Sequence, residues 1–272
     1  METQNNIMNI YDDFPVEINE NSSTKDLLDY MMLVLVRSID TNKAFKGGYL
    51  LSKILSGESR LTKDKDFSIM NKEYYEPIKE VLISIGEVFK IKGIVTDYKV
   101  KEEIKEFSSG GIKYYKDGKE VLGIDIGLHD ILYGTQNYDL EFGSVQGFSV
   151  ERMLADKLVA ILSKKRFRRT KDLYDFYILV NHFNVDYNSL VYCINNRAGF
   201  NPELWENIPF KEEILVEYKK AWDKLVLTSS ATGRPLNKPS FNDCISTYYS
   251  IALFIKSGNV ANYWNADEKR WC

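Results

Sequence analysis

The stretch Lys46–Leu51 (KGGYLL) and the later stretch Arg60–Phe67 (RLTKDKDF) decide the fold of this chain of 272 residues. The first predicts a buried strand that ends in a glycine turn and continues into a short helix. The second predicts a strand on which Asp64 and Asp66 are two positions apart. Side chains two apart on a strand point to the same face, so both carboxylates are expected side by side, with Ser68 next to them.

Two carboxylates this close repel each other unless a cation lies between them, and oxygen ligands of this kind suit magnesium. Gly47 and Gly48 allow a phosphate to approach the backbone and the N-terminus of the next helix. Each feature alone is common, since Gly-Gly turns and Asp-x-Asp pairs also occur on solvated surfaces. Their order, with Asp64 sixteen positions after Gly48, favours a phosphate-binding turn beside a metal site. That combination predicts nucleotidyl transfer.

A second block, Ser149–Ala160, predicts a helix that begins after Ser149 as N-cap and has apolar residues at helical spacing. Lys157 neighbours this apolar stripe. An ordinary lysine in that place lays its stem over apolar surface and keeps its ammonium in solvent. The alternative is a lysine that faces a cleft and binds nucleotide phosphates as a point charge.

The next helix is expected to begin with Thr170 as N-cap. Asp172 then falls in its first turn, where the helix dipole favours a negative charge. This gives Asp172, and Asp175 one turn later, a complete structural explanation.

Together the two blocks resemble the AbiEii/AbiGii toxin family of type IV toxin–antitoxin and phage-abortive systems, within the DNA polymerase β-type nucleotidyltransferase superfamily. The resemblance covers roughly residues 44–180. The family has a helical lysine followed by a small residue, then a basic stretch, then Lys/Arg-Asp-x-x-Asp. These features fall here at Lys157, Ala160, residues 164–169 and Lys171–Asp175.

The resemblance implies an α+β fold: a polymerase β-like nucleotidyltransferase domain with a mixed sheet, followed by a C-terminal helical domain. It implies that an acceptor hydroxyl attacks the α-phosphate of a nucleoside triphosphate (NTP) and that pyrophosphate leaves. Magnesium would be held by Asp64 and Asp66, phosphate oxygens by Lys157, and that lysine or a substrate group by Asp172. Some relatives modify the acceptor end of tRNA, so an RNA acceptor and an antitoxin encoded nearby are the expected partners.

A third carboxylate is predicted on the strand Val121–Leu128. Alternation places Asp125 on the face opposite the core residues, between Gly123 and Gly127, which leave room above it. An aspartate at a strand centre is unfavourable without a functional reason. Polymerase β-like enzymes have an acidic residue on a neighbouring strand that binds metal or activates the attacking hydroxyl, which the resemblance extends to Asp125.

One position departs from the family pattern. The family has Ser or Thr directly after the glycine pair, whereas this chain has Tyr49. We therefore expect phosphate contacts from the backbone N–H groups of the turn and from Ser52, one helical turn later.

Residues 163–171 form a basic run although the net charge of the whole chain is −3. Such a run is usually a solvated face, and beside a nucleotidyltransferase cleft it could equally bind RNA phosphates. The candidate acceptor-binding residues are Lys165, Arg166, Arg168 and Arg169.

Composition fits a soluble globular protein, with 44% apolar and 28% charged residues. The three cysteines are odd in number and far apart, which favours a reducing cytoplasm without a disulfide framework. The polar, acidic N-terminus lacks the pattern of a signal peptide, and no apolar stretch reaches the roughly 20 residues of a membrane span.

Periodicity predicts helices at 23–38, 49–56 and 72–86 and strands at 43–46, 65–70, 91–99, 111–116, 120–128 and 141–145. Further helices are predicted at 150–164, 171–182, 187–196, 211–226 and 241–257, and a loop at 228–240. The change from strand-rich to helix-rich sequence places the domain boundary between a nucleotidyltransferase domain, 1–148, and a helical domain, 149–272, that completes the cleft.

Two other classes of function stay open. One is a nucleotide-binding regulatory protein that keeps the fold but has lost transfer, in keeping with Tyr49. The other is a small-molecule enzyme such as an aminoglycoside nucleotidyltransferase, although the basic run favours a polyanionic acceptor over a cationic one.

Overall fold

The structure, a computed structural model, describes residues 17–38, 43–55, 59–62, 64–70, 75–102, 109–129, 133–140, 143–163, 169–230 and 232–272. The chain divides into two compact units. Unit 1 comprises Met1–Ile54 and Thr62–Gly147, and unit 2 comprises Leu55–Leu61 and Phe148–Cys272. The short segment 55–61 therefore leaves unit 1, joins unit 2 and returns. The predicted boundary at residue 148 does not include the transfer of residues 55–61 to unit 2.

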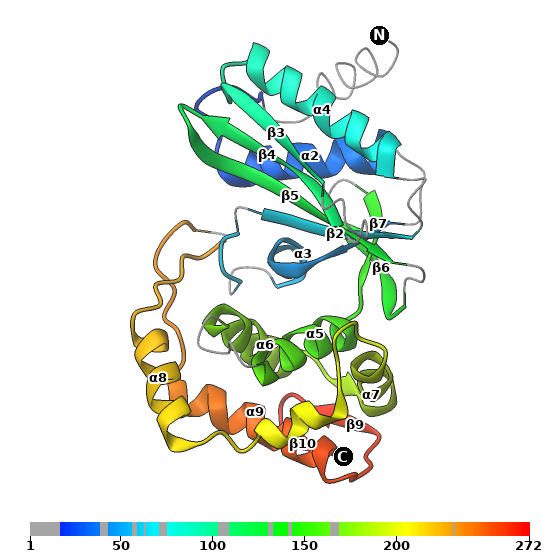
Figure 1. The fold of residues 1–272 in the computed structure, drawn as a ribbon, viewed down its shortest axis with the longest axis vertical. Coiled ribbons are helices and arrows are strands. Elements are labelled where there is room, and N and C mark those ends of the chain that lie inside the picture. Colours follow the sequence, from blue (N-terminus) through cyan, green and yellow to red (C-terminus); the bar gives the residue numbers. More distant parts are fainter. Residues whose placement is uncertain are drawn as a thin grey trace. The chain divides into compact units, whose positions relative to one another are not determined.

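Unit 1 is built on a sheet whose seven strands, all within the described ranges, have the order β3-β4-β5-β2-β1-β7-β6 (Figure 1). Strand β2 runs parallel to β5 and antiparallel to β1, so the sheet is mixed, which confirms the predicted fold class. The strands are β1 (Lys43–Lys46), β2 (Asp64–Met70), β3 (Asp97–Glu102), β4 (Ser109–Lys116), β5 (Lys119–His129), β6 (Thr135–Leu140) and β7 (Gly143–Phe148).

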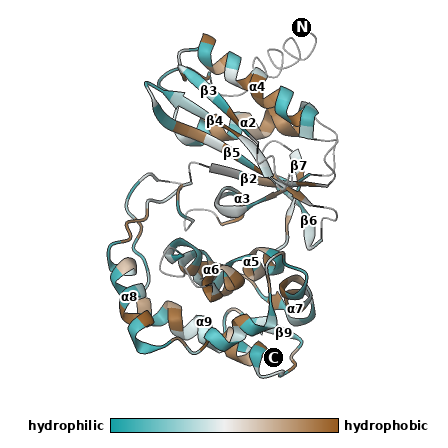
Figure 2. Cartoon of the chain, viewed as in Figure 1, coloured by the Kyte–Doolittle hydropathy of each residue, from teal (hydrophilic) through white to brown (hydrophobic). Residues whose placement is uncertain are grey.

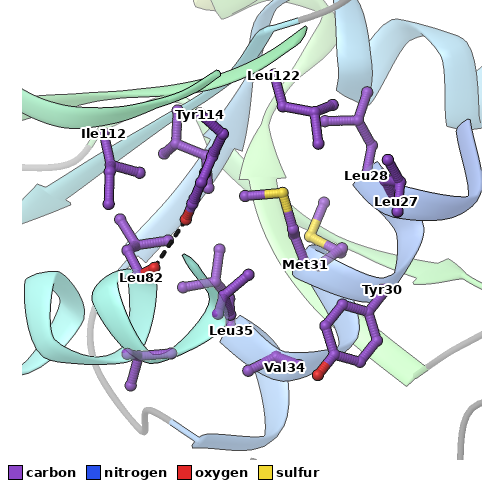
Figure 3. Packing of buried hydrophobic residues seen from close by; sticks show 14 of the residues in the cluster. Leu27, Leu28, Tyr30, Met31, Val34, Leu35, Leu82, Ile112, Tyr114 and Leu122 are labelled. Atoms are coloured by element: carbon purple, nitrogen blue, oxygen red, sulfur yellow. Dashed lines mark hydrogen bonds between the residues drawn. The ribbon is translucent and has the colours of Figure 1, made fainter. Parts of the chain in front are cut away.

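Helices α2 (Thr24–Ser38) and α4 (Tyr75–Ile91) pack together and against the sheet to form the core of unit 1. Figure 3 shows Met31 and Leu35 of α2 among side chains of α4, β4 and β5. The buried Tyr114 hydroxyl donates a hydrogen bond to the carbonyl of Leu82 over 2.8 Å, so its polar group is satisfied inside the core. Hydrophobic and hydrophilic residues alternate along α4, because one side of the helix faces the core (Figure 2).

Unit 2 consists mainly of helices. Helix α5 packs against α6 and α7, and α6 packs against α8 and α9. A small sheet with the strand order β10-β9-β8 joins the end of the chain to the start of α7. The elements are α5 (Val150–Leu162), α6 (Thr170–His182), β8 (Val185–Asp186), α7 (Tyr187–Asn195), η3 (Pro202–Asn207), α8 (Glu212–Asp223), α9 (Phe241–Lys256), β9 (Tyr263–Asn265) and β10 (Arg270–Trp271).

Residues 59–61 add a strand-like edge to a short hairpin of unit 2. Within the predicted loop 228–240, the N–H of Ser229 donates to the carbonyl of Arg234, and Thr228 pairs with Pro235. Arg60 forms an antiparallel bridge with Ser229 on the other side. The N–H of Leu61 also donates to the carbonyl of Thr228, so the backbone fixes where the Arg60 side chain begins.

The predicted strand at 91–99 was wrong in its first half. Helix α4 continues to Ile91, the chain turns at Gly93 with φ +69, and β3 begins only at Asp97. Alternating apolar residues around this turn imitate a strand. The Ser149 cap was right, because its side chain accepts a hydrogen bond from the N–H of Arg152.

The Thr170 cap was wrong. Thr170 is already helical, and Arg169 occupies the cap position without a side-chain cap bond. Across the described part of the chain, no helix is long and apolar enough to cross a membrane.

We expect Phe67→Ala to lower the free energy of unfolding by roughly 3–5 kcal/mol, because the substitution leaves a cavity in a packed core. Phe67 is fully buried on β2, with its ring centroid 5.7 Å from that of Phe45. Val100→Ala is the matched control, since Val100 is 38% exposed on β3. Urea denaturation followed by circular dichroism measures both. Equal shifts for the two variants would contradict the assignment of Phe67 to the core.

Candidate active site

The glycine turn lies between β1 and helix α3 (Gly47–Ile54). Gly47 is the first helical residue and has φ +71, which favours glycine. A Cβ atom at Gly47 would lie 2.5 Å from Oδ2 of Asp66, so any larger residue would collide with this carboxylate. The glycine therefore allows the N-terminus of α3 to start directly against Asp66.

Strands β2 and β5 bring Asp66 and Asp125 to paired positions. In the parallel register Asp66 is opposite Asp125, and Asp64 is opposite Gly123. Neighbouring strands lie about 4.8 Å apart, and paired residues share a face of the sheet. The prediction that Asp125 lies on the strand next to the Asp-x-Asp strand is therefore confirmed at the level of the backbone.

The Asp125 side chain is 42% exposed, and its Oδ2 lies 3.7 Å from Nζ of Lys113. The same ammonium lies 3.0 Å from Oε1 of Glu120, so Lys113 is shared between two carboxylates. The face that carries Asp66 and Asp125 thus combines acidic groups with a lysine of β4.

The donor set fits a hard divalent cation. Magnesium usually binds proteins through one or two carboxylates together with substrate phosphates, and Asp66 and Asp125 offer such oxygens from one face. Among the side chains that the structure describes, no three acidic, histidine or cysteine residues group together, and the Asp64 side chain lies outside that set. The magnesium ligands predicted from the sequence stay a prediction.

Tyr49, which replaces the hydroxyl residue of the family pattern, is buried against α2. Its hydroxyl donates to Oδ1 of Asp29 over 2.6 Å, and Nζ of Lys53 lies 2.7 Å from the same oxygen. Asp29 is itself buried, so it needs both partners to offset the loss of water. The tyrosine thus ties α3 to α2, and its hydroxyl is held by Asp29.

Ser52 was expected to supply a hydroxyl to phosphate. In the structure its Oγ donates to the carbonyl of Tyr49 over 2.6 Å, within the same helix. A serine bonded in this way would have to release the carbonyl before donating to a phosphate. The remaining donors of the turn are the backbone N–H groups at the start of α3, which suit anions.

In unit 2, Lys157 of α5 is held by two carboxylates of α6. Its Nζ lies 2.9 Å from Oδ1 of Asp172 and 2.9 Å from Oδ2 of Asp175. The Lys157 side chain is only 12% exposed, so its ammonium does not extend into bulk solvent as the ordinary alternative required. The structure brings Lys157 and Asp172 together, as the family resemblance implied.

Arg60 completes this charge cluster. Its Nε and Nη2 each lie 2.9 Å from one oxygen of Asp175, a bidentate pair. Burial raises the pKa of Asp175, but Lys157 and Arg60 outweigh burial and lower it below its usual range. Burial likewise lowers the pKa of Lys157, but Asp175 and Asp172 outweigh it and raise this pKa above its usual value. Asp175 and Lys157 therefore stay charged at neutral pH.

Of the predicted basic run, residues 164–168 lie outside the described residues, so Lys165, Arg166 and Arg168 stay predictions. Arg169 is half exposed, and its Nη1 lies 3.6 Å from Oδ2 of Asp172. The implied binding of one triphosphate by Lys157, Asp64 and Asp66 concerns residues of different units and also stays a prediction.

Sequence reasoning missed Arg60 as a member of the site and gave Asp175 only a structural explanation. Both were visible within the quoted motifs, Arg60 four positions before Asp64 and Asp175 as the second acid of Asp-x-x-Asp. No local pattern links the two residues, because they lie 115 positions apart in the chain.

Comparison with known families places the protein in the class of nucleotidyltransferases. A family model described as nucleotidyl transferase AbiEii toxin, type IV toxin–antitoxin system, matches residues 32–245. The match covers most of the chain, so the chain belongs to the AbiEii family of nucleotidyltransferase toxins, which confirms the resemblance. No curated protein matches the chain.

Several solved structures are similar at low identity. The nucleotidyltransferase toxin MenT4 (Rv2826c) of Mycobacterium tuberculosis H37Rv shares 17% identity over 71% of this chain and 70% of its own, with a TM-score of 0.43. JHP933 of Helicobacter pylori shares 16% identity over 86% of this chain and 91% of its own, with a TM-score of 0.48. The antibiotic-resistance factor ANT(2'')-Ia shares 12% identity over 63% of this chain and 89% of its own, with a TM-score of 0.42.

We expect Gly47→Ala to lower the free energy of unfolding more than Gly118→Ala. Both glycines have positive φ, where an L-residue costs roughly 1–2 kcal/mol. A Cβ at Gly118 would meet no atom within 4 Å, whereas a Cβ at Gly47 would collide with Asp66. Urea denaturation of the two variants measures the difference. Equal losses would show that Asp66 moves aside without cost.

We expect Asp175→Asn to destabilise the protein by about 3–5 kcal/mol near neutral pH, since it leaves buried cations short of a partner. The lowered pKa of Asp175 means that its contribution is complete above the ordinary aspartate pKa, about 3.9, and is lost as the pH falls through the lowered value. The difference from wild type should therefore shrink below about pH 4. Denaturation across pH, with the exposed Asp139→Asn as control, measures it, and a difference independent of pH would contradict the ionised pair.

Proposed function

We propose that the protein is a magnesium-dependent nucleotidyltransferase toxin that transfers a nucleotide from an NTP to a hydroxyl of an RNA acceptor of the tRNA type. Membership of the AbiEii family supports the toxin and transferase parts of this proposal. The observation that supports a magnesium-dependent phosphate site is the close approach of the Gly47 backbone to the Asp66 carboxylate. It combines a phosphate-binding helix start with a metal-type carboxylate inside one compact unit.

In the proposed reaction the acceptor oxygen forms a bond to the α-phosphorus, the bond from the α-phosphorus to the bridging oxygen breaks, and pyrophosphate leaves. Asp64 and Asp66 would hold magnesium, which would supply positive charge to the triphosphate. The N–H groups at the start of α3 bind phosphate oxygens. Asp125, which is 42% exposed, would either add to the metal site or accept the proton of the acceptor hydroxyl.

Lys157 binds phosphate oxygens as a buried point charge, and Asp172 sets the position of its ammonium. The basic run around Arg166 and Arg168 is proposed to bind the RNA phosphates.

A second function, nucleotide binding without transfer, is favoured by one observation. The hydroxyls of Tyr49 and Ser52, which are the side-chain hydroxyls at the turn, both donate to groups of the protein. Phosphate binding then depends on the backbone and on Lys157. The family assignment further supports a cognate antitoxin as the protein partner.

The test is incubation with each α-labelled NTP, magnesium and total tRNA, followed by denaturing electrophoresis of the RNA. We expect labelled RNA with wild type, and a loss on the order of 100-fold or more with Asp64→Ala or Asp66→Ala, because charge stabilisation in the transition state is lost. Asp139→Asn, an exposed aspartate on β6, is the control and should keep full activity.

Full activity of Asp66→Ala would exclude the proposed mechanism. Triphosphate binding without any labelled RNA, protein or small acceptor would favour the binding function instead. Transfer to an aminoglycoside but not to RNA would assign the protein a small-molecule acceptor.

A further inference from the structure

We propose that Arg60 is a positioning residue that shares the Asp175 carboxylate with Lys157 and thereby leaves Lys157 able to bind a triphosphate. This inference rests on the proposed function, and it assigns a role to a residue in the loop before the Asp-x-Asp strand. It concerns residues of unit 2 only.

The geometry shows that one carboxylate oxygen serves both cations. Oδ2 of Asp175 lies 2.9 Å from Nη2 of Arg60 and 2.9 Å from Nζ of Lys157. Oδ1 of Asp175 accepts from Nε of Arg60, also at 2.9 Å. Arg60 and Lys157 therefore compete for the charge of the same group, and Arg60 holds that group in a fixed plane through two bonds.

The charges of the cluster explain why this sharing affects ligand binding. Without Arg60, the ammonium of Lys157 would be the cation that faces the buried Asp175, while Asp172 also has the half-exposed Arg169 at 3.6 Å. With Arg60 present, its guanidinium matches the Asp175 carboxylate, and the positive charge of Lys157 stays available to a further anion. Asp175 is 3% exposed, so water does little to screen these interactions.

The Arg60 backbone is fixed independently of its side chain. It bridges Ser229, and the neighbouring N–H of Leu61 donates to the carbonyl of Thr228. Ser59 and Ser229 are both buried. A substitution at position 60 therefore changes the guanidinium while backbone bonds still hold the segment in place.

A purely structural ion pair predicts a different result from a positioning residue. A structural pair contributes to stability and leaves the affinity of the folded protein for nucleotide unchanged. A positioning residue changes that affinity, and it does so only while Asp175 carries its charge. A double-mutant cycle separates the two roles.

The experiment measures the Kd of a non-hydrolysable NTP with magnesium by calorimetry, for wild type, Arg60→Met, Asp175→Asn and the double variant. We expect Arg60→Met to raise Kd by roughly 3- to 30-fold, in the range of coupled neighbours. In the Asp175→Asn background the same change should alter Kd less than about twofold, because the shared carboxylate charge is gone. Arg234→Met, an exposed arginine of the same hairpin, should leave Kd unchanged.

Arg60→Lys keeps the charge but cannot form two parallel bonds, and it should raise Kd less than Arg60→Met. Arg60→Lys also replaces Arg60→Met as the test variant if Arg60→Met does not fold. A wild-type Kd in both Arg60 variants, or an equal effect of Arg60→Met with and without the Asp175 charge, would overturn the proposal.

A second readout does not depend on nucleotide. Removing Arg60 takes away a positive charge that lowers the pKa of Lys157, so the amine should react less with acetic anhydride at alkaline pH. Peptide mass spectrometry compares Lys157 with the exposed Lys171 in wild type and Arg60→Met. If wild type binds no triphosphate, the proposed function fails, and the role of Arg60 is then decided by this readout, in which unchanged Lys157 labelling overturns it.

Discussion

The buried carboxylate of Asp175 is the group on which the candidate site of unit 2 depends. A charge that has lost its water must be matched by partners at hydrogen-bond distance, and Asp175 has two, Arg60 and Lys157. Through them one side chain joins helix α5, helix α6 and a segment that precedes the Asp-x-Asp strand. The ion pairs orient the ammonium of Lys157, so that its charge is held in place before any substrate arrives.

In unit 1 the candidate site depends on the missing side chain of a glycine, and not on a buried ion pair. The missing side chain of Gly47 lets the start of α3 meet Asp66, and the parallel register of β2 and β5 sets Asp125 beside it. Tyr49 and Asp29 then anchor the same short helix to α2. A helix of eight residues has little stability of its own, so these tertiary contacts, and not its length, keep its N-terminus in position.

The sequence predicted the parts of this site that follow from local periodicity. A period of two sets Phe67 and Ile69 on the face opposite Asp66, where both are buried, and a period of 3.6 placed the buried face of α5. Family resemblance implied the contact between Lys157 and Asp172. The pairing of Arg60 with Asp175 spans 115 residues and leaves no local pattern, so it required the three-dimensional structure. The small strands β8–β10 have only two or three residues, too few to show alternation.

The exchange of residues 55–61 between the units has a consequence for the order in which the protein can be completed during synthesis. Ser59 contacts Ser230, 171 positions later in the chain. At about 5–20 residues per second, this partner emerges roughly 10–35 seconds after Ser59. Until then Arg60 and its neighbours lack the hairpin that holds them, although β2 can already pair within unit 1. A ribosome must therefore translate most of the chain before the hairpin can fix the Arg60 segment, although Lys157, Asp172 and Asp175 are made earlier.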